Sequence, residues 1–183
     1  GPGTADVGII LQGGMYNGVV RGLQQLGLSD AYGNARVPLY VRFKGSMHKD
    51  WVEISPKVIV EGVAAGADMP STSQPSPQDF EAAYQAAVAK GADTILCLTI
   101  SSELSGTFQS ANLAKANVPV PITVFDSRAA SVGLGDMAKK AAQLRDSGAG
   151  LEQILKAISH IRDTNKVFFT VETLNFLQKN GRI

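Results

Sequence analysis

Hydroxyl-bearing side chains are concentrated in one short stretch of this chain. Its members are Ser101, Ser102, Ser105 and Thr107, with Gly106 among them. The stretch follows the apolar run 94–98 and precedes a segment with apolar residues at helical spacing, which predicts a strand, a turn and a helix. A helix N-terminus offers unpaired N–H groups, and neutral hydroxyls add donors without adding charge. These residues are therefore candidates for holding an anion, although hydroxyls before a helix also act as ordinary caps.

A second group of hydroxyls lies upstream, in the sequence Ser-Thr-Ser-Gln-Pro-Ser-Pro at 71–77. A segment rich in Ser and Pro predicts a loop, and Ser76 before Pro77 is typical of a helix N-cap followed by proline at the first helical position. Thr72 and Ser73 remain as candidate ligand-binding hydroxyls. We expect the two groups to form one polar site from two loops, with a purely structural loop as the alternative.

The end of another expected strand carries a charged pair. Asp126 and Arg128 follow the apolar residues 122–125, where Arg128 either directs its guanidinium toward an anion or forms a salt bridge or cap. The two histidines, His48 and His160, lack the spacing of metal ligands, and neither has an adjacent Ser or Asp that would indicate a catalytic triad. The sequence therefore predicts binding residues and no catalytic residue.

Composition narrows the classes of function. The chain has 183 residues and a net charge of +1, which fits one folded domain without a field that would attract nucleic acid or a membrane surface. Its single cysteine, Cys97, lies in an apolar run, so the sequence predicts neither a disulfide framework nor a cysteine metal site. No apolar run reaches the ~18 residues of a membrane span and no signal peptide is evident, so we expect a cytoplasmic protein. The first residues, Gly1-Pro2-Gly3, are typical of the remnant of a cleaved tag.

Apolar runs and helical patterns alternate along the chain. The strands expected from them are 7–11, 37–43, 51–54, 93–99, 122–125 and 166–171, and the expected helices are 16–26, 57–65, 77–90, 104–116, 132–146, 151–162 and 173–179. Strands separated by helices predict an α/β fold with a mainly parallel sheet and flanking helices in three layers. Ligands bind beyond the carboxyl ends of such strands, where both the hydroxyl-rich turn and Arg128 are expected. We expect a single α/β domain over residues 1–183.

A glycine turn near the N-terminus supports a different function. The segment 8–15, which contains Gly13 and Gly14, loosely resembles the oxyanion loop that opens patatin-like lipases. A serine hydrolase of that kind also needs a nucleophile in a Gly-x-Ser-x-Gly elbow, and the sequence contains none. We therefore interpret the glycine pair as a tight turn between a strand and a helix, and keep a serine-type lipid hydrolase as an alternative.

Five motifs occur in the order in which one known family uses them. They are Val37-Pro38-Leu39-Tyr40-Val41, Thr72-Ser73-Gln74-Pro75-Ser76-Pro77, the stretch from Ser101 to Ala111, Asp126-Ser127-Arg128 with Gly133-Leu134-Gly135, and the stretch from Leu177 to Ile183. From Val37 onward the chain therefore resembles the DegV family of fatty-acid-binding proteins. The resemblance implies an α/β protein that buries one long-chain fatty acid, such as palmitate, in an apolar tunnel.

The resemblance also implies roles for individual residues. Thr72 and Ser105 would bind the carboxylate directly through their hydroxyls. The residues that would shape the pocket around them are Ser73, Ser102, Gly106 and Thr107, and Arg182 would lie near the carboxylate. The protein would be a carrier without catalytic residues, metal or cofactor, and it would present the acid to a partner kinase that makes an acyl phosphate.

Two departures from the family pattern are visible. The first strand leads to Gln12-Gly13-Gly14 where the family has Asp-Ser-Thr, and the second lobe that follows the Gly181-Arg182-Ile183 motif in the family is missing. A half-site left open in this way would expose an apolar patch, which favours self-association or contact with a partner. A remnant that binds only a partner protein, without lipid, is therefore a further alternative.

Overall fold

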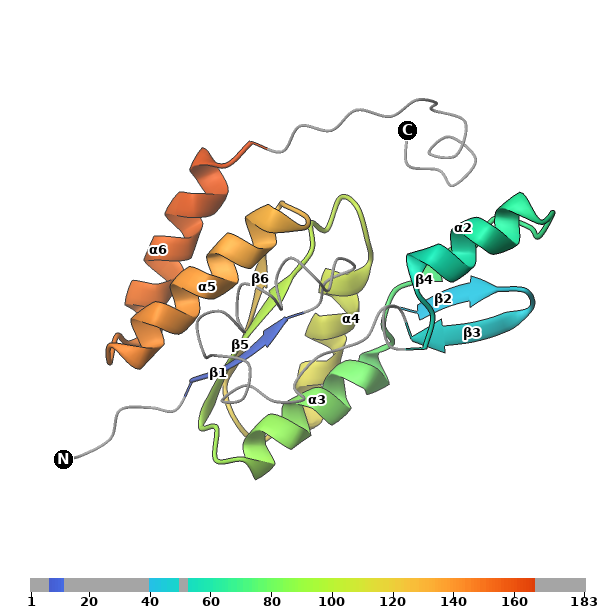
Figure 1. Ribbon diagram of the computed structural model, residues 1–183. Helices are drawn as coiled ribbons and strands as arrows, with labels where there is room; N and C mark the ends of the chain where they lie inside the picture. The colour runs from blue at the N-terminus through green and yellow to red at the C-terminus, as the bar shows by residue number, and fades with distance from the viewer. Residues whose placement is uncertain (1–6, 12–39, 50–52, 167–183) are drawn as a thin grey trace.

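The computed structural model describes residues 7–11, 40–49 and 53–166 (Figure 1). Its larger sheet consists of the parallel strands β1 (Val7–Leu11), β5 (Thr94–Thr99) and β6 (Ile122–Asp126), in the order β1-β5-β6. In the register of this sheet, Leu96 of β5 pairs with Ile9 of β1 and with Thr123 of β6. The central strand is thus paired along both edges, as its continuous apolar run predicts.

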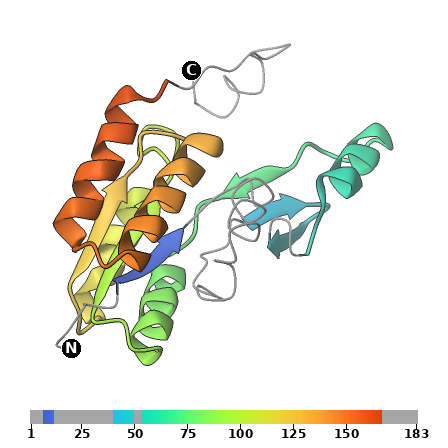
Figure 2. The same ribbon diagram turned by 60° about the vertical axis from the view of Figure 1, so that its left-hand side comes forward.

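Helices cover both faces of this sheet (Figures 1 and 2). One face carries α3 (Pro77–Ala89), α4 (Thr107–Leu113) and the short 3-10 helix η1 (Ala114–Asn117), and the other carries α5 (Val132–Asp146) and α6 (Leu151–Thr164). Ile95 and Cys97 of β5 pack with α3 and α4, whereas Leu96 and Leu98 pack with α5 and α6. All four side chains are fully buried. The three-layer α/β architecture expected from the sequence is confirmed.

A smaller antiparallel sheet lies beside the three-layer body (Figure 2). It contains β2 (Tyr40–Phe43), β3 (Ser46–Lys49) and β4 (Ser71–Ser73) in the order β3-β2-β4, with α2 (Pro56–Ala64) packed against it. The turn of the β2–β3 hairpin places Lys44 and Gly45 at φ values of 49° and 80°, the positive values that a tight two-residue hairpin turn requires. The buried core of this sheet consists of Val41, Phe43 and Ile54.

Three expected elements differ from those observed. The segment 70–77 predicts only a loop, but residues 71–73 form β4 because their backbone pairs with β2 from a distant part of the sequence. The expected strand 51–54 shows, in its described residues, a turn followed by a single bridge at Ile54. The expected helix 104–116 begins at Thr107 and continues into η1, since Leu104 and Ser105 donate their N–H groups to the Ser101 carbonyl in a turn.

Several expectations fall on residues that the structure does not describe. They are the helices 16–26 and 173–179, the strand 166–171 beyond its first residue, the Gly13-Gly14 turn and Arg182. Among the described ranges, no helix is both long enough and apolar enough to cross a lipid bilayer.

Candidate functional site

The candidate site lies at the carboxyl edge of the larger sheet. Strands β5 and β6 are parallel and adjacent, so the loops that follow them leave the sheet side by side. The Ser101 N–H donates to the Ala129 carbonyl at 2.9 Å, and the Ser127 N–H donates to the Thr99 carbonyl at 3.3 Å. The backbone thus holds the hydroxyl-rich turn against the loop that carries Arg128.

The carboxylate of Asp126 joins these two loops. One of its oxygens accepts the N–H groups of Ser102 at 3.1 Å and of Arg128 at 3.0 Å, and the other accepts the Ser102 hydroxyl at 2.5 Å. Because the hydroxyl hydrogen of Ser102 is directed to this carboxylate, Ser102 can meet a ligand in this arrangement only as an acceptor. The sequence alone predicts a salt bridge or a cap at Asp126, and its position at the end of a strand is the signal in the sequence for this bridging role.

Ser105 and Thr107 form a pair of hydroxyls at the start of α4. Their side-chain oxygens lie 2.8 Å apart, and the Thr107 N–H donates to the Ser105 oxygen at 3.3 Å. Thr107 is fully buried, whereas Ser105 is half-buried. Either hydroxyl can be the donor in their contact, and when Thr107 donates, the hydroxyl hydrogen of Ser105 is available to a ligand.

Thr72 and Ser73 lie in the exposed edge strand β4 of the smaller sheet, opposite Val41 and Tyr40 of β2. They are connected to the α4 region through the next residue, Gln74. Its side-chain nitrogen donates to the Ser110 hydroxyl on α4 at 3.2 Å. The structure therefore brings the two hydroxyl-bearing segments to neighbouring positions through Gln74, a residue that no sequence pattern marks as a candidate.

Gly106 lies directly under the Gln74 side chain. A Cβ atom at Gly106 would lie 2.3 Å from the side-chain oxygen of Gln74 and 2.6 Å from its nitrogen. The φ of Gly106 is −69°, a value that any residue adopts, so the backbone does not require glycine here. The absence of a side chain at Gly106 leaves the space that the Gln74 amide occupies.

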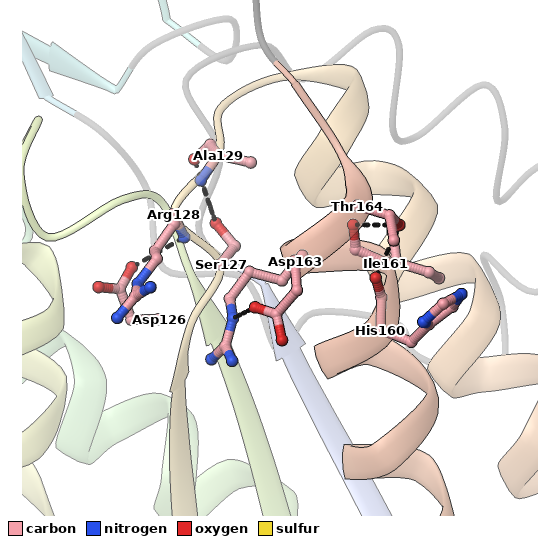
Figure 3. Close-up of polar contacts among 9 residues, drawn as sticks. Asp126, Ser127, Arg128, Ala129, His160, Ile161, Asp163 and Thr164 are labelled. Atoms are coloured by element: carbon pink, nitrogen blue, oxygen red, sulfur yellow. Dashed lines mark hydrogen bonds and ion pairs between the residues drawn. The ribbon is translucent and has the colours of Figure 1, made fainter.

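Arg128 lies on the β6–α5 loop in an exposed position (Figure 3). Its φ is 49°, in the left-handed region that non-glycine residues adopt only when neighbouring contacts hold them there. The contacts are the Asp126 bond to its N–H and the buried Ser127 hydroxyl, which accepts the Ala129 N–H at 3.2 Å. Figure 3 shows the side chain of Arg128 next to that of Asp126.

The end of α6 adds charge near this loop. Arg162 donates to the carboxylate of Asp163 at 2.9 Å (Figure 3). Its guanidinium lies 5.1 Å from the centre of the Phe125 ring. The hydrogen bond from Arg162 lowers the pKa of Asp163, with smaller contributions from the charges of Arg128 and His160. Arg128 is therefore within electrostatic reach of this exposed cluster.

The described groups whose pKa values are raised most lie away from the loops that follow β5 and β6. Burial raises the pKa of the Cys97 thiol to about 12, and burial also raises the pKa of the Tyr84 hydroxyl, which donates to the Ala111 carbonyl at 3.1 Å. Both side chains belong to the core under α3. Over the residues with described placement, no group of three or more His, Cys, Asp or Glu side chains could hold a metal ion. The loop edge therefore presents the hydroxyls of Ser105 and Thr107 beside the Asp126 carboxylate and the Arg128 guanidinium.

Comparison with known proteins gives a family match over most of the chain. The family model for uncharacterised proteins of the DegV family matches residues 28–183. A DegV domain-containing protein of Deinococcus radiodurans is 44% identical over 153 residues, which cover 84% of this chain and 54% of that protein. A fatty acid-binding protein of Thermotoga maritima is 36% identical over 154 residues, which cover 80% of this chain and 52% of that protein.

A solved structure shares the fold. The structure of a DegV family protein from Thermus thermophilus, which was described for its fatty acid binding, superimposes on this chain with a TM-score of 0.81 at 38% sequence identity. The match covers 96% of this chain and 60% of that chain. This chain spans about half the length of the curated relatives it matches.

Proposed function

This chain belongs to the DegV family, and on that basis we propose that it binds the carboxylate of a long-chain fatty acid with neutral hydroxyl groups. The observation that carries the proposal is the convergence of two hydroxyl-bearing segments at one end of the fold, where Gln74 links β4 to α4. The fatty-acid binding of the relatives from Thermotoga maritima and Thermus thermophilus supports the choice of ligand.

In this proposal Thr72 and Ser105 donate hydrogen bonds to the carboxylate. Ser73, Ser102, Gly106 and Thr107 shape the site around them. Hydrogen bonds to an ionised group are stronger than those between neutral groups, so a few hydroxyls suffice to orient a carboxylate. The guanidinium of Arg128 adds positive charge at the rim, and we assign Arg182 to the same head group from the family resemblance alone.

The acyl chain supplies most of the affinity. Burial of ~14 methylene groups stabilises the complex by about 11 kcal/mol at ~0.8 kcal/mol each. The entropy lost on association and on ordering of the acyl chain opposes this by a model-dependent ~4–15 kcal/mol. The tail can therefore hold the ligand while the hydroxyls determine its orientation. Neutral donors also suit a head group that changes from a carboxylate to an acyl phosphate, since a buried lysine would need its own counter-charge.

We further propose that the protein is a carrier and that a partner kinase performs the phosphoryl transfer. At the proposed site the Ser102 hydroxyl donates to the Asp126 carboxylate, and no described histidine makes a hydrogen bond to a serine there, as a hydrolase with a Ser-His pair would need. An assay with a fluorogenic fatty-acyl ester tests this directly, and steady hydrolysis by the purified protein would contradict the carrier role.

The test of the proposal combines mass spectrometry with mutagenesis. Organic extraction of the purified protein should release a fatty acid, and delipidated protein should bind palmitate in isothermal titration calorimetry. The double substitution Thr72→Ala and Ser105→Ala should weaken palmitate binding by at least about a hundredfold, because two hydrogen bonds to an ionised group are lost and each is worth ~1.5–3 kcal/mol. Ser147→Ala is the matched control, because the Ser147 hydroxyl is exposed and donates to the Leu144 carbonyl at the far end of α5.

Two results would contradict this assignment. Unchanged palmitate affinity in the double variant would remove Thr72 and Ser105 from the head-group site. Absence of any acyl species in the extract, together with no heat of binding for added palmitate, would remove fatty acid as the ligand of this chain.

A further inference from the structure

Gln74 belongs to the upstream hydroxyl-bearing segment, and its amide side chain reaches the other segment at Gly106. Its side chain crosses over Gly106 and donates to Ser110 at 3.2 Å, so it contacts α4 at two adjacent turns. Gly106 has an ordinary backbone conformation, and its lack of a side chain leaves the space that the Gln74 amide occupies. The contact therefore depends on a complementary pair of residues, one long and one without a Cβ.

The residues on either side of Gln74 are held by other contacts. Ser73 pairs with Tyr40 across the smaller sheet, and the Tyr40 hydroxyl donates to Asp79 on α3 at 3.1 Å. Asp79 also accepts the Ser76 N–H at 2.8 Å in the capping box that begins α3. The polypeptide from β4 to α3 is thus fixed to α3 at one end, while Gln74 fixes it to α4.

We propose that Gln74 is a positioning residue, which sets the separation between the hydroxyls of β4 and the Ser105–Thr107 pair. This inference rests on the proposed function, because it assigns a role within the same carboxylate site. Gln74 acts through the geometry of Thr72 and Ser73 and does not itself bind the ligand. Gly106 is the second residue of this pair, since any side chain at that position displaces the Gln74 amide.

An amide suits this role better than a charged group of the same shape. The Gln74 nitrogen donates to a serine hydroxyl, which leaves its carbonyl oxygen as a neutral acceptor. A glutamate at this position would lose the donor and would place a negative charge close to the hydroxyls that are to hold a carboxylate. Gln74 is itself exposed, so its replacement opens no cavity in the core.

The experiment compares the affinity for palmitate with the affinity for hexadecanol, which has the same chain length and no carboxylate. Gln74→Ala should reduce the preference for the acid over the alcohol about tenfold, because hydroxyls that are out of register orient a carboxylate poorly. Its affinity for hexadecanol should stay within about twofold of the parent protein, since the tail contacts are unchanged. Gln85→Ala is the control, because Gln85 makes a comparable bond, at 3.0 Å, from α3 to the Asn117 carbonyl.

A double-substitution cycle tests the pairing with Gly106. Gly106→Ala should reduce the preference for the acid as strongly as Gln74→Ala does, and the two changes together should do no more than either alone. Additive losses, or a preference for the acid that Gln74→Ala leaves unchanged, would overturn the proposed role of Gln74.

A ligand-free measurement separates this inference from the proposed function. Amide hydrogen exchange of β4 should accelerate at least about tenfold in Gln74→Ala and stay unchanged in Gln85→Ala. If the parent protein shows no preference for the acid, the proposed function fails while the exchange result still decides the role of Gln74. Exchange of β4 that is the same in parent and variant would overturn that role.

Discussion

At the scale of single residues, hydrogen-bond partners separate side chains that look alike in the sequence. Ser102 and Ser105 both belong to the hydroxyl-rich turn, but the hydroxyl of Ser102 is directed to Asp126 while that of Ser105 is paired with Thr107. The Asp126 carboxylate accepts three hydrogen bonds and so holds the two loops together. We therefore expect Asp126 and Ser102 to hold the loops in place, and Ser105 to be the better donor for a ligand.

The Cys97 thiol provides a prediction at this scale. Its pKa is raised to about 12 by burial, so at pH 8 only about one thiol in ten thousand is ionised. We expect negligible reaction with Ellman's reagent in the native protein at pH 8 and one equivalent in 8 M urea. Rapid stoichiometric labelling of the native protein would contradict the buried placement.

The raised pKa of Cys97 also makes the free energy of unfolding depend on pH. Above pH 9.0, which is the ordinary pKa of a thiol, the unfolded state loses the Cys97 proton whereas the folded state keeps it. The contribution of this group to the free energy of unfolding is therefore complete below pH 9 and declines as the pH rises toward 12. Cys97→Ala should show a smaller decline over this alkaline range in urea unfolding.

At the scale of elements, the helix starts illustrate how local sequence and tertiary contacts combine. Both α2 and α3 begin with the sequence Ser-Pro, which is typical of an N-cap followed by proline at the first helical position. Only α3 uses the serine side chain: the Ser76 oxygen accepts the Asp79 N–H at 3.2 Å, whereas Ser55 makes no side-chain cap. The two helices therefore provide an internal comparison of the same motif.

Replacement of the two cap serines tests this difference. Ser76→Ala should lower the free energy of unfolding by about 1 kcal/mol, because an N-cap hydrogen bond is lost. Ser55→Ala should change it by less than about 0.5 kcal/mol, since no cap bond is present to lose. Urea unfolding followed by circular dichroism measures both, and equal effects of the two substitutions would contradict the capping assignment.

At the scale of the whole molecule, the described chain has a large and a small core. The three-layer body buries side chains on both faces of β5, while the smaller sheet buries Val41, Phe43 and Ile54. A core of three side chains offers little hydrophobic stabilisation of its own. The smaller sheet, which carries Thr72, is therefore expected to open more readily than the body that carries Ser105. We propose that one α/β domain nevertheless includes both, since β4 leads directly into α3.

Hydrogen exchange tests this ranking of the two cores. Amides of β5 should be the most protected in the described chain, and those of β2 and β3 should exchange faster. Phe43→Ala should accelerate exchange in β2 and β3 by at least about tenfold and leave β5 unchanged, because the Phe43 ring contributes only to the smaller core. Ile158→Ala in α6 is the reciprocal control, because Ile158 packs in the body. Equal acceleration everywhere after Phe43→Ala would show that the cores open together.

The sequence by itself determined the parts of this protein that depend on local patterns. Apolar runs bounded by turns identified β5 and β6, helical spacing identified α3, α5 and α6, and the order of motifs identified the family. These elements can be predicted because the period of the hydrophobic residues and the chemistry of a helix cap depend on only a few neighbouring positions.

Only the tertiary structure decided how the distant parts meet. The three hydroxyl-bearing residues of β4 looked like a loop because a strand without apolar alternation reveals itself only through its partner, which here is β2. The role of Gln74 could not be predicted from its own neighbours, since its contacts with Gly106 and Ser110 exist only after the residue that follows β4 is placed against the start of α4. The same holds for Asp126, whose carboxylate meets Ser102 only when β5 and β6 are adjacent. Contacts of this kind arise from packing between elements, and no local pattern in the sequence encodes them.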